Sequence, residues 1–135
     1  MNVVYKLSEE QIHQLHLLYQ TAWWAKGRYL EATKRCVAAS QVCIGLIDSQ
    51  NNLIGFTRVL TDYTFKALIF DVLVCESHRG AGLGNKLIAL VKEHPDLATV
   101  QHFELYCRPD MNDFYVRHGF TSELGEFQFM RFTNS

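Results

Sequence analysis

The sequence has neither a long apolar run nor an excess of charge of one sign. Lys and Arg number 13 and Asp and Glu number 14, so the formal net charge is -1, and no basic block appears. Proteins that bind nucleic acids usually carry such a block, because it neutralises backbone phosphates. No apolar run approaches the roughly 20 residues that a membrane span needs. We therefore expect neither a nucleic-acid partner nor a membrane-embedded segment.

Signals for export, disulfide formation and metal binding are missing as well. The first ten residues, MNVVYKLSEE, lack a charged region followed by an apolar one. No C-x-x-C pair suits zinc or redox chemistry, and His13 and His16 have no third ligand at a suitable spacing. We expect a soluble, cytoplasmic protein without a metal. The cysteines, expected to be reduced, are Cys36, Cys43, Cys75 and Cys107.

The length and composition favour one domain over residues 1–135. The chain has 135 residues, of which 48% are hydrophobic and 13% aromatic. This is enough for one sizeable core and too little for two. No internal repeat, linker or low-complexity segment interrupts it.

The first half of the chain reads as a strand, two helices and a hairpin. Residues 3–7 alternate as a short strand, and Ser8 with Gln11 has the form of a capping box that opens a helix. A second helix is predicted over residues 29–39. Two antiparallel strands, within 41–48 and 52–60, are joined by polar residues. One face of the first helix is predicted to carry Ile12, Leu15, Tyr19 and Trp23.

The second half adds a central strand, two helices and two further strands. Residues 67–75 are nearly continuously apolar, which suits a strand covered on both faces, although Asp71 interrupts them. A glycine loop leads into a helix, followed by a strand in HFELYC, a short helix ending near Gly119, and an alternating strand EFQFMRF. The fold class is therefore α/β, a mixed sheet flanked by helices in the order β-α-α-β-β-β-α-β-α-β. Four apolar residues give the helix after the loop its period: Leu83, Leu87, Ile88 and Val91.

The glycine-rich turn between this strand and helix is suited to bind an anion. Such a turn aims free backbone N–H groups and the positive end of the helix dipole at one point. The phosphate loop of nucleotide hydrolases requires G-x-x-x-x-G-K-[ST], but the sixth position counted from Gly80 is Asn85. The dinucleotide fingerprint G-x-G-x-x-G also fails, because Gly80 and Gly82 lead to Asn85, and Gly82 and Gly84 lead to Leu87.

The pattern that fits is Arg/Gln-x-x-Gly-x-Gly/Ala. It is present as Arg79-Gly80-Ala81-Gly82-Leu83-Gly84, and the downstream segment FYVRHGF is similar to F/L-Y-x-x-x-G-F. With these motifs and its element order, the chain from Val3 to Phe132 resembles the GCN5-related N-acetyltransferase (GNAT) superfamily. The resemblance implies that the loop cradles the pyrophosphate of acetyl-coenzyme A. The alternative is a purely structural turn.

The resemblance also assigns roles near the thioester. In the family, free backbone N–H groups of the central strand hold the pantetheine arm and the thioester oxygen, and here these positions fall at Leu73 and Val74. Tyr115 is placed beside the coenzyme sulfur, where its hydroxyl protonates the leaving thiolate. The alternative is that Tyr115 only packs the core, together with Phe114 and Phe120.

An ammonium acceptor must lose a proton before it attacks, and a carboxylate in a partly buried strand accepts it directly or through water. Asp71 is the best-placed candidate, and Glu76, nearer the loop, is the second. A structural hydrogen bond or ion pair explains Asp71 equally well.

The acceptor is expected to meet residues between the first two helices. Trp24, Arg28 and Tyr29 lie off the apolar stripe, and a guanidinium there can hold a carboxylate on the acceptor. Trp23 is predicted to be buried. Arg58 and Asp62 are weaker candidates, which an exposed face explains as well.

One position departs from the family. An Asn often precedes the tyrosine-bearing helix and contacts the coenzyme, but Arg108 and Pro109 stand near that place. Arg108 is a candidate to reach a phosphate instead.

The sequence as a whole predicts an acetyl-coenzyme A dependent N-acetyltransferase that acts on a small primary amine by direct transfer in a ternary complex. The alternatives are a non-catalytic acyl-coenzyme A sensor or interaction module on the same fold, and a protein lysine acetyltransferase. The segment EFQFMRF fits a homodimer interface and fits an ordinary core strand equally well.

Overall fold

The computed structural model describes residues 1–134, which fall into two compact units. The first unit is Met1–Leu105 and contains the sheet and three α-helices. The second begins at Tyr106 and contains one short helix and an extended C-terminal segment. The prediction that residues 1–135 form a single domain stays a prediction.

The sheet of the first unit has five strands in sequence order. The first three pairs of neighbouring strands are antiparallel, and the last pair is parallel. The strands are β1 (Asn2–Val4), β2 (Val42–Ile47), β3 (Leu53–Thr61), β4 (Lys66–Val74) and β5 (His102–Glu104). The connection from β4 to β5 crosses over through a helix, as a parallel pair requires. The α/β class with a mixed sheet is therefore confirmed.

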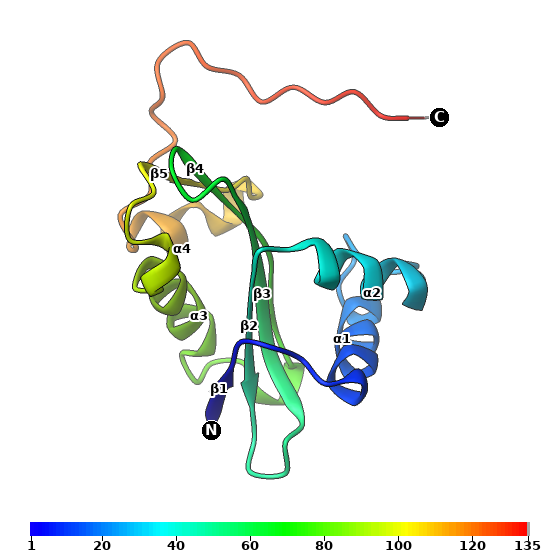
Figure 1. The fold of residues 1–135 in the computed structure, drawn as a ribbon. Helices are drawn as coiled ribbons and strands as arrows, with labels where there is room; N and C mark the ends of the chain where they lie inside the picture. The colour runs from blue at the N-terminus through cyan, green and yellow to red at the C-terminus, as the bar shows by residue number, and fades with distance from the viewer. Residues whose placement is uncertain (135) are drawn as a thin grey trace. The chain divides into compact units, whose positions relative to one another are not determined.

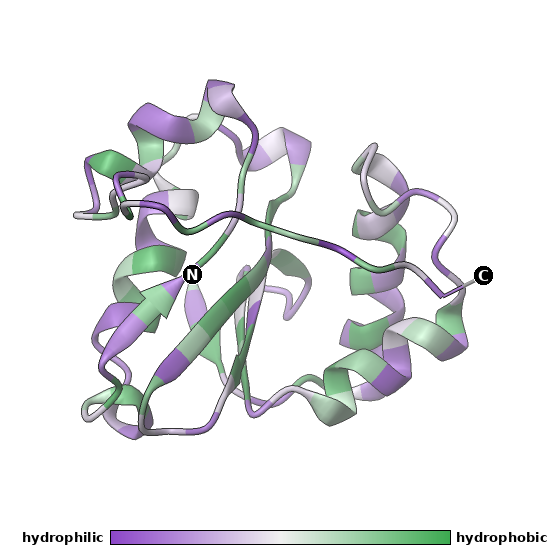
Figure 2. Cartoon of the chain, turned by 90° about the horizontal axis from the view of Figure 1, so that it is seen from above, coloured by the Kyte–Doolittle hydropathy of each residue, from purple (hydrophilic) through white to green (hydrophobic). Residues whose placement is uncertain are grey.

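Helices cover both faces of this sheet. Figure 1 shows α1 (Glu9–Thr21) and α2 (Leu30–Ala39) on one face and α3 (Leu83–Lys92) on the other. The predicted capping box is present, because the Gln11 amide donates to Ser8 Oγ and the Ser8 amide donates to Gln11 Oε1. In Figure 2 the strands are mostly hydrophobic, which agrees with a sheet buried on two sides.

Two apolar layers hold the helices to the sheet. On the α1 side, Leu15 and Tyr19 pack with Phe56 of β3 and Leu73 of β4 in one buried cluster. On the other side, α3 buries the apolar residues that its sequence period predicted: Leu83, Leu87, Ile88 and Val91. Burial of each such side chain contributes about 1.5–3 kcal/mol. These layers fix the start of α3 and the middle of α1 relative to β4.

The predicted burial of Trp23 is wrong. α1 ends at Thr21, and Ala22 already has extended backbone angles, so the helical period does not continue to residue 23. Trp23 is 68% exposed. The apolar stripe of α1 therefore ends at Tyr19.

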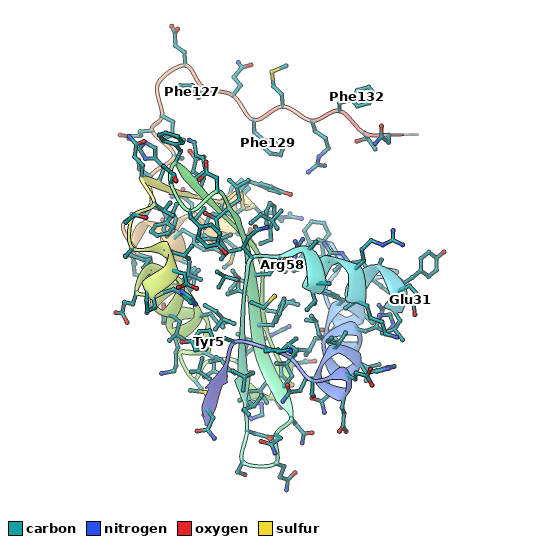
Figure 3. The ribbon with its side chains drawn as sticks, in the orientation of Figure 1. Tyr5, Glu31, Arg58, Phe127, Phe129 and Phe132 are labelled. Atoms are coloured by element: carbon teal, nitrogen blue, oxygen red, sulfur yellow. The ribbon has the colours of Figure 1, made fainter. Side chains whose placement is uncertain are left out.

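In the second unit, α4 (Asn112–Val116) is the predicted short helix. Gly119 follows it with φ of 90°, the left-handed conformation expected after a helix end. The predicted strand in residues 126–132 is not formed. A strand needs a hydrogen-bonded neighbour, and this segment has none among the described residues; Figure 3 shows Phe127, Phe129 and Phe132 projecting from extended chain.

None of the helices within residues 1–134 is long and apolar enough to cross a membrane.

Candidate functional site: a glycine loop, an open strand edge and an arginine cluster

The glycine loop follows β4 and a short 3-10 turn, Glu76–His78. Gly80 and Gly82 have φ of 82° and 79°, a region that other residues enter at a cost of roughly 1–2 kcal/mol. A Cβ at either glycine would meet nothing within 4 Å, so backbone conformation rather than space requires glycine there. The loop residues Arg79 to Gly82 are exposed, and Leu83 is buried as the first residue of α3.

The turn leaves backbone N–H groups free at the start of α3. Gly82 is the N-cap, and no side chain caps the helix there. The Lys86 amide donates to the Gly82 carbonyl over 3.0 Å, so the amides of Leu83 and Gly84 precede the first intrahelical bond. Free amides and the positive end of a helix dipole together are suited to bind an anion.

The edge of β4 beside this loop is open. β5 pairs only with Lys66 to Leu68, so the later residues of β4 have no strand neighbour on that side within the described residues. The Cys75 amide donates to Ile54 in β3, and backbone directions alternate along a strand, so the Leu73 amide also faces β3. The Val74 amide then faces the open edge. The Val74 carbonyl lies on that edge too, where it accepts a hydrogen bond from Arg79 Nε at 3.3 Å.

Upstream on the same strand, a β-bulge places Asp71. Phe56 pairs with Leu73 and Arg58 with Phe70, so Thr57 faces two residues of β4 instead of one. The fully buried Thr57 hydroxyl donates to the Phe70 carbonyl over 2.8 Å. Asp71 has φ of 58°, a left-handed conformation that Asp tolerates better than most residues.

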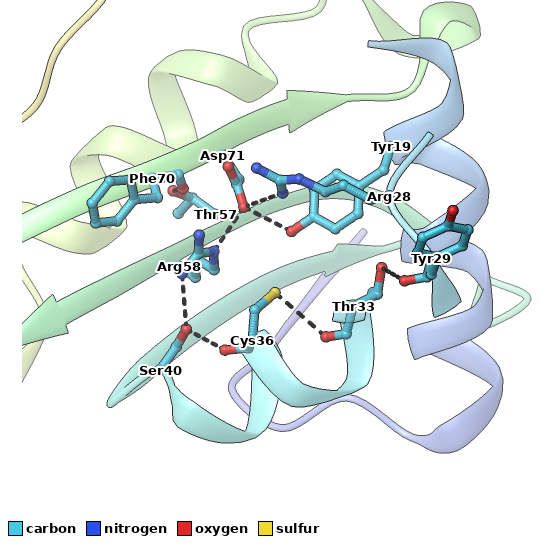
Figure 4. A network of polar contacts seen from close by, with 10 residues as sticks. All are labelled: Tyr19, Arg28, Tyr29, Thr33, Cys36, Ser40, Thr57, Arg58, Phe70 and Asp71. Carbon is cyan, nitrogen blue, oxygen red and sulfur yellow. Dashed lines mark hydrogen bonds and ion pairs between the residues drawn. The ribbon is translucent and has the colours of Figure 1, made fainter. Parts of the chain in front are cut away.

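Three donors converge on one oxygen of Asp71 (Figure 4). Oδ2 accepts hydrogen bonds from Tyr19 Oη at 2.8 Å, Arg28 Nη1 at 3.0 Å and Arg58 Nε at 2.7 Å. The Asp71 side chain is only 5% exposed. Burial by itself raises the pKa of the Asp71 carboxyl, but the hydrogen bonds and charges of Arg58 and Arg28 outweigh it and hold the pKa below its usual value.

Ionised Asp71 also keeps Tyr19 protonated. Burial and the neighbouring carboxylate raise the pKa of the Tyr19 hydroxyl well above its ordinary value. The phenol therefore acts as a hydrogen-bond donor and not as a base. These ion pairs favour the structural alternative for Asp71, because a carboxylate with a lowered pKa is a weak acceptor for an ammonium proton.

Tyr19, Arg28, Arg58 and Asp71 are called the arginine cluster below. Of the three predicted acceptor residues, Arg28 belongs to this cluster, Trp24 lies beside Arg28, and Tyr29 lies apart. The Arg28 guanidinium lies over the rings of Tyr19 and Trp24, with its carbon 4.6 Å and 5.4 Å from their centroids. Trp24 is 40% exposed, and Tyr29, the N-cap of α2, is 80% exposed and outside these contacts.

The weaker candidates divide. Arg58 belongs to the cluster and also donates to Ser40 Oγ at 3.4 Å. Asp62 instead caps a turn, where its Oδ1 accepts from three backbone amides. Glu76 is exposed on the short turn after β4. Within residues 1–134, no group of three His, Cys, Asp or Glu side chains could hold a metal ion.

Tyr115 lies in the second unit, on α4, and is buried. Its ring packs edge-on against Phe114 and Phe120, at centroid distances of 4.9 Å and 5.9 Å. Burial, with a smaller effect of Cys107, raises the pKa of Tyr115 to about 12. The hydroxyl is therefore protonated at neutral pH, which both the proton donor and the core aromatic require. Arg108, in the same unit, lies 3.9 Å from Asp110.

Sequence reasoning missed Tyr19 as a polar participant. The sequence pattern places Tyr19 only on the apolar stripe of α1, yet a tyrosine buried in a core needs a partner for its hydroxyl. Asp71, alone on an apolar strand, needs donors for the same reason. A buried hydroxyl that needs an acceptor and a buried carboxylate that needs donors could have been matched from the sequence. Nothing local in the sequence, however, indicates that residues 52 positions apart meet.

The comparisons with known proteins agree with this architecture. The model of the acetyltransferase (GNAT) family matches residues 9–120. The chain belongs to the acetyltransferase (GNAT) family. A relative in Pyropia yezoensis, named as the uncharacterized N-acetyltransferase ycf52, is 30% identical over 115 residues, which are 83% of this chain and 66% of the relative. The chain thus spans slightly less than two thirds of that relative's length.

Solved acetyltransferase structures superpose over most of the chain. A crystal structure of a protein assigned to the GNAT family from Xanthomonas campestris pv. campestris has a TM-score of 0.81 and 30% identity, and covers 98% of this chain and 94% of its own. An aminoglycoside 6'-N-acetyltransferase complexed with coenzyme A has a TM-score of 0.67 at 16% identity, covering 78% of this chain and 61% of its own. The second likeness shows the fold alone. The predicted family is confirmed.

Proposed function

We propose that this GNAT protein is an acetyl-coenzyme A dependent N-acetyltransferase. It moves the acetyl group to a primary amine of a small molecule by direct transfer in a ternary complex. The observation that carries the proposal is the glycine loop with free amides beside an open edge of β4. A diphosphate at the loop and an extended thiol arm along the strand edge use both features at once.

The loop residues Arg79, Gly80, Ala81, Gly82, Leu83 and Gly84 hold the pyrophosphate in this proposal. The Val74 amide, which faces the open edge, donates to the thioester oxygen and stabilises the negative charge that develops there. Leu73 contributes less than expected from the sequence, because its amide faces β3. Its buried side chain fixes the strand against α1 instead.

The acetyl group passes directly from the thioester to the amine, so no covalent bond to the protein is formed. The neutral amine attacks the carbonyl carbon, the carbon–sulfur bond breaks, and the thiolate receives a proton from the Tyr115 hydroxyl. The nitrogen loses its extra proton to water as the amide forms, and the Tyr115 phenolate takes a proton back from water. Before attack the ammonium must lose one proton. The general-base role of Asp71 stays a prediction. The ion pairs of Asp71 favour release of that proton to water. Glu76, which is more exposed, is the second candidate to accept it.

Two measurements test the proposal. Calorimetry with acetyl-coenzyme A tests the loop, and we expect saturable uptake at one site per chain. Release of free thiol in the presence of an amine panel tests transfer, and the acetylated product is identified by mass spectrometry. Uptake without turnover on any amine or peptide favours the non-catalytic sensor, and turnover on lysine peptides but not on free amines favours the lysine acetyltransferase.

Cellular location and assembly remain parts of this proposal. The cytoplasm is the expected compartment. A homodimer is the expected partner state if the exposed Phe127, Phe129 and Phe132 pack against a second copy. Sedimentation of the wild type against a triple variant in which all three are Ser tests that assembly.

A further inference from the structure

The charges at Asp71 do not balance. Two guanidinium groups, those of Arg28 and Arg58, are paired with one carboxylate. Within residues 1–134, Asp71 is the only acidic side chain that forms an ion pair with either arginine. Arg58 is 13% exposed and Asp71 5% exposed, so the net positive charge lies in a region where water screens it poorly. An anion from outside the protein would neutralise it.

Arg28 is the member of the cluster that can receive such an anion. It contributes one nitrogen, Nη1, to Asp71, while its Nε and Nη2 have no hydrogen-bond partner among the described residues. Its side chain is 33% exposed. Arg58, in contrast, is more deeply buried and divides its donors between Asp71 and Ser40.

Arg28 is also held in place before any ligand arrives. The ion pair to Asp71 and the rings of Tyr19 and Trp24 fix the guanidinium plane. Most of the entropy lost on ordering an arginine side chain is therefore lost on folding and not on binding. A fixed guanidinium with two free nitrogens matches the planar, two-oxygen geometry of a carboxylate, and it also accepts a phosphate.

The backbone at Asp71 supports a role beyond packing. A bulge and a left-handed φ of 58° are needed to bring this carboxylate to the arginines. Such conformations cost roughly 1–3 kcal/mol for most residues and gather at functional sites. A buried ion pair of this kind adds little net stability over apolar side chains of similar size. The strained conformation at Asp71 is therefore better explained by a role in positioning Arg28 and Arg58 than by a gain in stability.

The cluster lies on the strand that carries the proposed thioester site. Val74 lies three positions after Asp71, so the two residues are at most about 10 Å apart along the strand. We propose that Arg28 binds an anionic group, a carboxylate or a phosphate, on the acceptor, so that the substrate is an amine that also carries an acidic group. The inference rests on the proposed function, because it names the acceptor of that same transfer.

Matched acceptors test it. Each pair shares an amine and differs in charge: an amino acid and its amide, and phosphoethanolamine and ethanolamine. At saturating acetyl-coenzyme A we expect kcat/KM for at least one anionic member to exceed that of its neutral partner by roughly tenfold to a hundredfold, the range of one or two charge-assisted hydrogen bonds. The pair that shows the difference tells carboxylate from phosphate.

Arg28→Gln then assigns the effect to this side chain. It should remove the preference mainly through KM, and kcat/KM should fall at least about tenfold more for the anionic acceptor than for its neutral partner. Arg28→Lys should restore part of the preference, since it keeps the charge but not the two-pronged geometry. Arg35→Gln removes an exposed guanidinium from α2 and is the matched control. Unchanged circular dichroism and coenzyme uptake show that the variants are folded.

Failure of the inference and failure of the proposed function look different. Equal use of charged and neutral acceptors, or equal losses for both in Arg28→Gln, overturns the inference and leaves the acetyltransferase intact. If no amine is turned over, the proposed function fails, and calorimetry with the same pairs still decides the anion site. Binding of the anionic acceptors in preference to the neutral ones, lost in Arg28→Gln, supports the anion site. Absence of that preference in the wild type overturns the anion site.

Discussion

The Tyr19 hydroxyl donates a hydrogen bond to Oδ2 of Asp71 over 2.8 Å, which joins the middle of α1 to the bulge of β4 (Figure 4). The same oxygen accepts from Arg28, on the segment between α1 and α2, and from Arg58 on β3. One carboxylate oxygen therefore ties together four parts of the first unit. Removal of the Asp71 carboxylate should therefore both lower the free energy of unfolding and displace Arg28.

Tyr19→Phe removes one of the three donors and keeps the buried ring. A hydrogen bond to a charged group contributes about 1.5–3 kcal/mol, and two donors remain on the oxygen, so we expect a loss near the lower value. Urea unfolding followed by circular dichroism measures it. Tyr29→Phe is the control, because that side chain is 80% exposed and its change should be close to zero.

Asp71→Asn leaves two guanidinium groups without their counter-charge. Loss of one partner of a buried pair costs about 3–5 kcal/mol, and the lower part of that range applies because Arg28 is partly exposed. If Asp71 is the general base, kcat should also fall by roughly 10²–10⁴ and the acidic limb of the pH–rate profile should disappear. If it only arranges the arginines, the KM for the acceptor should rise and that limb should remain.

The contribution of Asp71 to stability should depend on pH in one direction. Its pKa is lowered in the folded protein, so the contribution is complete above the unfolded value of about 3.9 and is lost as the pH falls through the lower, folded value. The difference in unfolding free energy between wild type and Asp71→Asn should be constant from pH 7 to about pH 5 and shrink below about pH 4. A difference that grows on acidification would contradict the ion-pair assignment.

Gly82→Ala tests the loop. Its φ of 79° should cost roughly 1–2 kcal/mol with any Cβ, although the space around it is open. Relief of that strain moves the amides at the start of α3, and we expect coenzyme affinity to fall at least about tenfold in calorimetry, the equivalent of 1.4 kcal/mol. Gly125→Ala, with φ of 71° and equally open surroundings, is matched for strain and should keep full affinity.

Tyr115→Phe separates catalysis from packing. The ring contacts with Phe114 and Phe120 are preserved, so stability should change by less than about 1 kcal/mol. As proton donor to the thiolate, the hydroxyl should account for roughly 10²–10⁴ in kcat, with coenzyme affinity unchanged. Unaltered turnover would leave Tyr115 as a core aromatic.

Most of the fold could be predicted from the sequence, because its determinants are local. The capping box at Ser8, the apolar period of α3 and the left-handed Gly119 each act over a few residues. The glycine loop was located for the same reason. The error at Trp23 came from extending a helical period past Thr21, where no residue in the pattern marks the end.

The arginine cluster and the missing last strand depend on distant parts of the chain. Residues 126–132 alternate as a strand does, but alternation does not supply the neighbour that a strand requires. Asp71 was recognised as unusual on an apolar strand, yet its partners come from α1, the following segment and β3. Only the folded chain shows that Tyr19, Arg28 and Arg58 meet on one oxygen.

The extra residue in β4 has a geometric effect on the sheet. A bulge bends its strand and increases the local right-handed twist, so the two halves of β4 run in different directions. β5 pairs with the half before the bulge and stops at Leu68. The bulge follows the last paired residue of β4 by only a few positions, so it turns the unpaired end of the strand away from the line of the paired end. Shortening β4 by one residue there should straighten the strand and re-aim the Val74 amide.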